Sequence, residues 1–376
     1  MQLRSVQHLV RIILSLTLIL FVADLTQGQH HERHRRRAHH RERDCSRCLS
    51  VVTSLPGLAS IAEELGGDSV LVYHIAAGNQ DPHFVQPKPS YAQLLSTADL
   101  FVTTGLDLEL WVPTLLDKAR NTKIYEGGIG YVSAATDIPL LEKPTLNPDR
   151  SMGDVHVYGN PHIHTSPLNA KRIAQNIRIG LRKVAPGQAE QIDRRYREFV
   201  SAIDSALFGK ELVELFGGEL LSKMLESGQL MEFLKTREYG GKRLIEMLGG
   251  WLRKGLPFRG KKVICYHKNW IYFARDFGLV IVDYIEPKPG IPPTAKHVKE
   301  VIETVTNEKI QVMIVATYFE KHSPEMVAER TGITSVFLPL DVGGTSDVPT
   351  YFDLIDKWIE QLNSAFGTAA QPRTNR

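Results

Sequence analysis

The sequence predicts two α/β lobes, each built on a parallel sheet, joined by a helical middle segment. Short apolar runs alternate with helical patterns before residue 150 and again after residue 260, and the stretch between them is almost wholly helical in pattern. Helices that separate successive strands imply parallel pairing with right-handed crossovers, the doubly wound arrangement. A chain of 376 residues is long enough for each lobe to bury its own core.

The first lobe is expected at residues 47–185. Its strands are predicted at 49–55, 69–76 and 99–105, with a fourth after the segment 122–128. Its helices are predicted at 56–67, 90–98, 108–120 and 167–184. The first of these helices is closed by glycine, which is typical of a helix C-terminus.

The middle of the chain follows a break at the sequence "APGQ". A second long helical pattern comes next, charged and sparsely apolar, which suits a helix exposed along one side. We expect residues 186–208 to form a long rigid connecting helix and residues 209–260 to form a helical insertion.

The second lobe is expected at residues 261–366, followed by a disordered tail at 367–376. Its strands are predicted at 261–267, 279–286, 310–319 and 333–341. Its helices are predicted at 269–278, 294–308, 323–332 and 350–366.

The N-terminus has the pattern of an export signal at residues 1–29. Arg4 and Arg11 precede "IILSLTLILFVA", an apolar run too short to span a bilayer comfortably, and small residues allow cleavage near Gln29. An uncleaved anchor is the alternative. Because no cysteine directly follows the apolar run, we do not expect lipid attachment there. The sequence therefore indicates a periplasmic or otherwise extracytoplasmic protein.

The segment 30–46 is rich in histidine and arginine and is expected to be a disordered tail. Residues 30–43 hold six arginines and two glutamates, a net charge of +4 against +3 for the whole chain. The basic character is thus local, which argues against a nucleic-acid-binding protein. An accessory metal-capture role is one hypothesis for its histidines, and a solvated arm that touches anionic surfaces is the other. The histidines concerned are His30, His31, His34, His39 and His40.

The chain contains three cysteines. Cys45 and Cys48 form "CSRC", which in an exported protein is expected to be inert or to form a small-loop disulfide. Zinc binding by this pair together with the tail histidines is the weaker alternative, because no second pair is present. Cys265 stands alone.

Several histidines follow predicted strands. His83 lies in the loop "GNQDPHFVQPKPS", His162 lies in "DVHVYGNPHIHTSP", and His267 ends the strand "KKVICYH". Ligands of open α/β sheets collect beyond the carboxyl ends of the strands, so these side chains can converge between the lobes. Imidazoles on proline-bounded loops suit a zinc-like ion. By spacing alone the signal is weak, since about a hundred residues can separate neighbouring candidates.

The same segments resemble a known family. "DPHFVQPKPS", "ADLFVTTGLDLELW", "GNPHIHTSPLNAKRIAQNI" and "VICYHKNWIYFARDFGL" are similar, in order, to elements of the zinc/manganese-binding periplasmic solute-binding proteins of ABC importers, the ZnuA/TroA type of cluster A-I. The resemblance runs from about residue 48 to residue 365. It implies two α/β lobes, a rigid connecting helix and a metal site in the cleft between the lobes.

The resemblance also implies the ligands. His83, His162 and His267 would bind the metal, and Asp341 in "LPLDVGG" would be the fourth ligand, with Glu320 and Glu286 as rivals. Three imidazoles and a carboxylate close a tetrahedral zinc site at bond lengths of about 2.0–2.1 Å, and a closed site holds a metal without activating water.

Two further histidines are expected around the ligands. His156 would support His162 from the second layer of residues, or orient its loop through a backbone hydrogen bond. His164 departs from the apolar or aromatic residue that is usual after the family's histidine, and we expect it at a polar rim, with an extra ligand as the alternative.

The predicted function is capture of Zn²⁺, with Mn²⁺ as the alternative, and its delivery to an ABC permease with its ATPase. We expect a monomer, no enzyme activity and no nucleic-acid partner. One alternative is a zinc-dependent hydrolase with Glu320 as general base, although the chain has no H-E-x-x-H or G-x-S-x-G motif. Another is a metal-binding surface adhesin on the same fold.

Overall fold

The computed structural model describes residues 48–144, 156–286 and 290–369. They belong to one compact unit, Arg47–Arg376. The predicted signal segment and the histidine-rich tail lie outside the described residues. None of the helices within the described ranges is long and apolar enough to cross a membrane.

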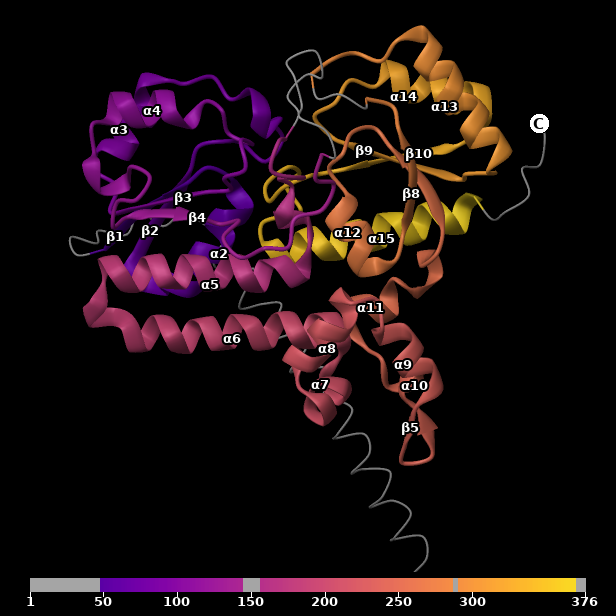
Figure 1. The fold of residues 1–376 in the computed structure, drawn as a ribbon, viewed down its shortest axis with the longest axis horizontal. Helices are drawn as coiled ribbons and strands as arrows, with labels where there is room; N and C mark the ends of the chain where they lie inside the picture. The colour runs from indigo at the N-terminus through magenta and orange to yellow at the C-terminus, as the bar shows by residue number, and fades with distance from the viewer. Residues whose placement is uncertain (1–47, 145–155, 287–289, 370–376) are drawn as a thin grey trace, which may run out of the picture. The chain divides into compact units, whose positions relative to one another are not determined.

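The first lobe contains a four-stranded parallel sheet in the order β2-β1-β3-β4. Its strands are β1 (Leu49–Thr53), β2 (Val70–His74), β3 (Leu100–Thr103) and β4 (Tyr131–Ser133). Its helices are α2 (Pro56–Gly66), α3 (Pro89–Ser96), α4 (Val112–Ala119), α5 (Pro167–Val184) and α6 (Ala189–Phe208). Figure 1 shows α5 and α6 as two long neighbouring helices, and α2 packs against both of them.

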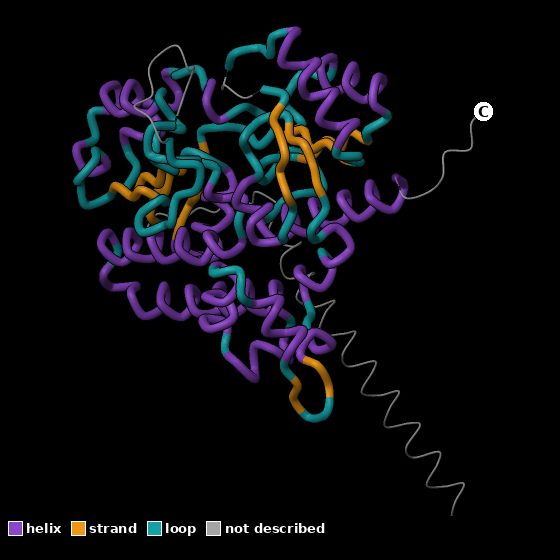
Figure 2. Tube along the Cα trace, turned by 45° about the vertical axis from the view of Figure 1, so that its right-hand side comes forward, coloured by secondary structure: helices purple, strands orange, loops and turns teal. Residues whose placement is uncertain are grey.

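The second lobe contains another four-stranded parallel sheet, in the order β10-β9-β7-β8. Its strands are β7 (Lys262–Cys265), β8 (Val280–Tyr284), β9 (Val312–Ala316) and β10 (Thr334–Leu338). Its helices are α12 (Ile271–Phe277), α13 (Ala295–Asn307), α14 (His322–Thr331) and α15 (Tyr351–Ala369). Figure 2 shows purple helices beside the orange strands of each lobe, as expected for parallel sheets. The predicted pair of parallel α/β lobes is confirmed.

The segment between the lobes is mostly helical, as expected, but it also contains a small hairpin. Its elements are α7 (Lys210–Phe216), α8 (Gly218–Glu226), α9 (Leu230–Thr236), β5 (Glu238–Tyr239), β6 (Lys242–Arg243), α10 (Leu244–Met247) and α11 (Gly250–Lys254). Gly240 and Gly241 both have positive φ, which is the backbone shape of a tight two-residue hairpin turn. The Glu226 carboxylate pairs with Arg172 of α5 and lies 4.0 Å from Arg275 of α12, so the insertion contacts helices of both lobes.

Short 3₁₀ turns complete the chain: η1 (Gly67–Ser69), η2 (Pro82–Phe84), η3 (Thr122–Ile124), η5 (Ile163–Thr165), η6 (Pro186–Gln188) and η7 (Leu256–Phe258). Several boundaries differ from the prediction, and three of them bear on the site or on the lobe limits. The helix expected at 108–120 begins only at Val112, and the loop before it contains Leu106 and Asp107 at positive φ. Strand β7 ends at Cys265, so His267 lies just beyond the strand. Helix α15 extends to Ala369, three residues past the predicted end of the lobe.

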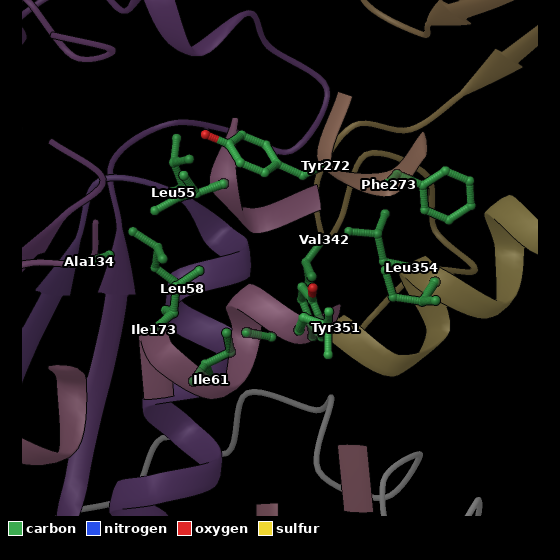
Figure 3. Packing of buried hydrophobic residues seen from close by; sticks show 14 of the residues in the cluster. Leu55, Leu58, Ile61, Ala134, Ile173, Tyr272, Phe273, Val342, Tyr351 and Leu354 are labelled. Atoms are coloured by element: carbon green, nitrogen blue, oxygen red, sulfur yellow. The ribbon is translucent and has the colours of Figure 1, made fainter. Parts of the chain in front are cut away.

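The two lobes share one apolar core. Figure 3 shows Leu58 and Ile61 of α2 and Ile173 of α5 in the same cluster as Tyr351 and Leu354 of α15. The backbone N–H of Tyr351 donates to the Ser60 hydroxyl of α2 at 3.1 Å. A wide hinge opening would expose this surface to water at a cost of about 25 cal/mol for each Å² of apolar area. The packing therefore favours small movements of one lobe against the other.

Candidate metal centre

The three histidines carried over from the family come together in the structure. One nitrogen atom from each of His83, His162 and His267 lies within 4.8 Å of the others. The His83 ring centroid is 5.3 Å from that of His162 and 5.8 Å from that of His267, and the last two are 5.9 Å apart. His162 and His267 are buried, and the His83 side chain is only 4% exposed. Residues separated by more than 180 positions thus form one cluster.

His83 is held by its own loop. Asp81 accepts hydrogen bonds from the His83 backbone N–H at 3.0 Å and from its ring Nδ1 at 2.7 Å, both through Oδ1. The Trp111 indole N–H donates to the Pro82 carbonyl at 2.8 Å and fixes the loop from outside. Burial raises the pKa of Asp81, but the side-chain and backbone hydrogen bonds and the charge interaction with His83 together outweigh it, so the net pKa is lowered. An ionised Asp81 places the His83 proton on Nδ1, so the Nε2 lone pair is available to a metal.

His162 and His267 are linked through Asn160. The Asn160 side chain accepts from the His162 backbone N–H at 3.0 Å and donates to the Lys268 carbonyl at 2.6 Å. The Tyr272 hydroxyl donates to the Asn160 carbonyl at 2.7 Å. One buried amide therefore sets the position of a first-lobe histidine against the loop that carries the second-lobe histidine. Asn160 and Asp81 were not predicted as site residues, although Asn160 opens the "NPH" segment and Asp81 opens the "DPH" segment.

The ring nitrogens of the inner histidines have few protein partners. Within the described residues, three of these nitrogens make no hydrogen bond of ordinary geometry: both ring nitrogens of His267, and Nδ1 of His162. Nε2 of His162 lies 3.4 Å from the amide nitrogen of Asn269. Buried polar atoms are normally paired, so these unpaired nitrogens are available to bind a cation.

Burial favours the neutral form of these imidazoles. Burial, together with repulsion from neighbouring histidines, lowers the pKa of His267 to about 3 and places the pKa of His162 well below its ordinary value. A metal binds the neutral imidazole, so the environment disfavours the proton as a competitor.

The three candidate carboxylates lie in different surroundings. Asp341 is buried, and burial raises its pKa to about 7 although backbone N–H groups of Val342 and Gly57 oppose the shift. Burial also raises the pKa of Glu286 to about 7. Glu320 is largely exposed at the start of α14. Among the described residues, none of the three joins the histidines within 4.8 Å.

Glu320 caps the helix that follows it. One of its oxygens accepts from the His322 backbone N–H at 2.6 Å, and the other accepts from Ser323 at 3.2 Å and from the Tyr266 hydroxyl at 3.4 Å. Partial burial raises its pKa, but these bonds lower it overall. The carboxylate thus stabilises the first turn of α14.

The two remaining predicted histidines adjoin the cluster in different ways. His156 contacts His83, with the two Nε2 atoms 3.1 Å apart, and burial lowers its pKa to about 3. His164 is 2% exposed instead of lying at a polar rim, and its ring is 6.2 Å from that of His162. The Tyr351 hydroxyl of α15 donates to the His164 carbonyl, because the second lobe covers this turn. Burial lowers the pKa of His164 to about 4.

Glu109 is another residue that sequence reasoning did not single out. It is buried where the loops after β1 and β3 meet, and burial raises its pKa. It accepts from the Ser54 hydroxyl at 2.5 Å and from the backbone N–H groups of Thr104 and Gly105 at 2.9 and 3.2 Å. The carboxylate therefore braces the carboxyl end of the first sheet. Its place in the "LDLELW" segment was the available signal.

The described cysteines differ in state. Cys48 is disulfide-bonded, whereas Cys265 is free and buried in β7. Cys45 lies outside the described residues. The disulfide expected for the "CSRC" segment agrees with the state of Cys48.

Comparison with known proteins also points to metal binding. The sequence model of the family described as zinc-uptake complex component A, periplasmic, matches residues 51–207 and 245–365. The iron-binding protein YfeA of Yersinia pestis is 24% identical over 336 residues, which cover 86% of this chain and 88% of YfeA. The zinc-binding lipoprotein AdcA of Streptococcus pneumoniae is 23% identical over 341 residues. That match covers 86% of this chain but 58% of AdcA, so this chain spans little more than half of AdcA.

The fold is also that of a solved structure. The crystal structure of ZnuA aligns with a TM-score of 0.61 and 22% identity, over 85% of this chain and 99% of that chain. The gap in the family match, residues 208–244, contains α7, α8, α9 and the hairpin. These elements are therefore an addition to the part of the chain that the family shares.

Proposed function

Because this chain belongs to the family of the periplasmic zinc-uptake complex component A, we propose that it is an extracytoplasmic receptor that captures Zn²⁺ and delivers it to an ABC importer. The observation that carries the proposal is the cluster of His83, His162 and His267. Two of these ligands come from the first lobe and one from the second, so the metal would lie where loops of both lobes meet.

The ligand chemistry favours zinc as the cargo. Neutral imidazoles bind zinc-like ions well, whereas Mn²⁺ sites use more oxygen ligands. YfeA is named as an iron-binding protein and AdcA as a zinc-binding lipoprotein, so the family by itself leaves the metal open. The proposal of zinc as the cargo therefore depends on the three nitrogen ligands, and Mn²⁺ is the alternative cargo. Asp341 remains the carboxylate that family resemblance predicts as the fourth ligand.

Transport explains the site better than hydrolysis does. Glu320, the general base of the hydrolase alternative, has oxygens engaged by backbone N–H groups at the start of α14. A base in that position has no free geometry toward a metal-bound water. The adhesin alternative would use the same metal site but would need no permease.

The shared core bears on how the metal leaves. Because α2 and α15 pack together across the lobes, we propose that release proceeds through the loops carrying His83 and His267 with a small rotation of the lobes. The partner would be a membrane permease with its ATPase, and the receptor would act as a monomer. The histidine-rich segment 30–46 would raise the local zinc concentration without forming the transport site.

The test is zinc titration of three proteins: the chain without residues 1–29, the chain from residue 44, and the latter with His83→Ala and His267→Ala. We expect one tightly held zinc in the first two and its loss in the third. His322→Ala, which removes an exposed histidine of α14, is the matched control. If the chain from residue 44 binds no zinc while the longer chain does, the metal site is in the tail and the proposal is wrong.

A further inference from the structure

His156 makes a contact that the three-histidine cluster does not explain. Its Nε2 atom lies 3.1 Å from Nε2 of His83, and the two rings stack with centroids 5.2 Å apart. Nδ1 of His83 donates to Asp81, so Nε2 of His83 presents its lone pair. The proton between the two Nε2 atoms therefore belongs to His156. A second imidazole thus points at the atom of His83 that a metal would use.

The spacing of this pair matches neighbouring ligands on zinc. Nitrogens bound tetrahedrally at about 2.0–2.1 Å are separated by about 3.3–3.4 Å. The His83–His156 distance of 3.1 Å is near this value, and one nitrogen from each of His83, His162 and His267 lies within 4.8 Å of the others. His156 stands outside that group of three and approaches from the side of His83. The His83–His156 pair therefore already has a spacing close to that of two zinc ligands.

The carboxylates that compete for the fourth position are otherwise engaged. Asp341 accepts from the Val342 backbone N–H at 2.7 Å, and Glu286 accepts from the Gly290 backbone N–H at 2.6 Å. Each carboxylate uses one oxygen in this bond, and among the described residues neither joins the three histidine nitrogens within 4.8 Å. His156 would exchange its hydrogen bond to His83 Nε2 for a bond to the metal that His83 binds.

We propose that His156 is the fourth ligand, so that four imidazoles, three from the first lobe and one from the second, hold the cargo. The inference rests on the proposed function, since it concerns the same metal. On loading, His156 loses the proton at Nε2 and gains one at Nδ1 through water, and no net proton is released. Asp81, bonded to His83, supplies a negative charge beside these ligands. An all-nitrogen site selects Zn²⁺ against Mn²⁺.

The test counts imidazoles on the metal by zinc-edge X-ray absorption. The protein is the full mature chain in which the five tail histidines are replaced by glutamine, loaded with one equivalent of Zn²⁺. We expect four imidazole nitrogens, with one fewer in His156→Ala and in His156→Gln. Asp341→Asn and the surface control His322→Ala should keep all four. Zinc affinity, measured by chelator competition, should fall at least about 10–100-fold in both His156 variants.

A supporting residue would lower affinity without changing the imidazole count, and that result would overturn the inference. So would loss of an oxygen ligand in Asp341→Asn. Urea midpoints equal to that of the parent in either His156 variant show that folding is intact. Failure of the proposed function gives a different result, because the parent chain would then hold no zinc that His83→Ala removes.

Discussion

Asp81 provides the sharpest test of how the site is built. Its carboxylate holds both the backbone and the ring of His83, and the ring bond of 2.7 Å fixes the tautomer that exposes Nε2. When Nε2 binds a metal, Nδ1–H becomes more acidic and the bond to the carboxylate strengthens. Removing the charge should therefore weaken the metal complex more than it weakens the fold.

The expected size follows from the bond and its exposure. A hydrogen bond to a charged group contributes about 1.5–3 kcal/mol, and the Asp81 side chain is 22% exposed, so the lower half of that range applies. A loss of about 1.5–2 kcal/mol corresponds to roughly 10–30-fold weaker zinc binding. Asp81→Asn keeps the shape and an acceptor oxygen, so it should lose less affinity than Asp81→Ala.

The assay is chelator competition for Zn²⁺ on the chain from residue 44, with urea unfolding as a check on stability. Asp117→Asn removes an exposed carboxylate from α4 of the same lobe and should leave zinc affinity unchanged. If both Asp81 variants bind zinc within twofold of the parent, the carboxylate does not orient His83 and the reasoning fails.

Two other predictions concern stability. The zinc-depleted chain should lose stability as pH falls from about 6.5 toward 4, by up to about 1.4 kcal/mol per pH unit for each histidine whose folded pKa is lowered, such as His267 at about 3 and His164 at about 4. The reason is that these histidines take up protons at a higher pH in the unfolded chain than in the folded one. The raised pKa of Asp341 acts in the opposite direction. Urea midpoints that do not fall as the pH falls would refute this prediction. Gly57→Ala should cost about 1–3 kcal/mol, because a Cβ there would lie 2.5 Å from Asp341 Oδ1. The loss of stability should be smaller when Gly57→Ala is combined with Asp341→Ala. An equal loss with and without Asp341→Ala would show that the contact with Asp341 is not the cause.

Much of the fold was predictable because local patterns and tertiary packing agree. Helix α5 was predicted with the bounds that the structure has, since Ser166 caps its N-terminus and proline opens its first turn. The predicted start of α4 was four residues too early, and the loop before the helix contains Leu106 and Asp107 at positive φ. The hairpin β5–β6 is too short for any two-residue period to reveal.

The sequence by itself determined the lobes and their parallel sheets, because strand–helix alternation forces the strand ends, and the loops that carry His83 and His267, to one edge of each sheet. The choice of His83, His162 and His267 as ligands came from the family resemblance of their segments. Only the tertiary structure decided what surrounds those ligands. Whether His156 faces His83, whether His164 is buried, and which donors occupy Asp341 depend on side-chain direction and on contacts between residues far apart in the chain. Such contacts leave no periodic trace in a sequence, since each is set by how two loops pack against each other.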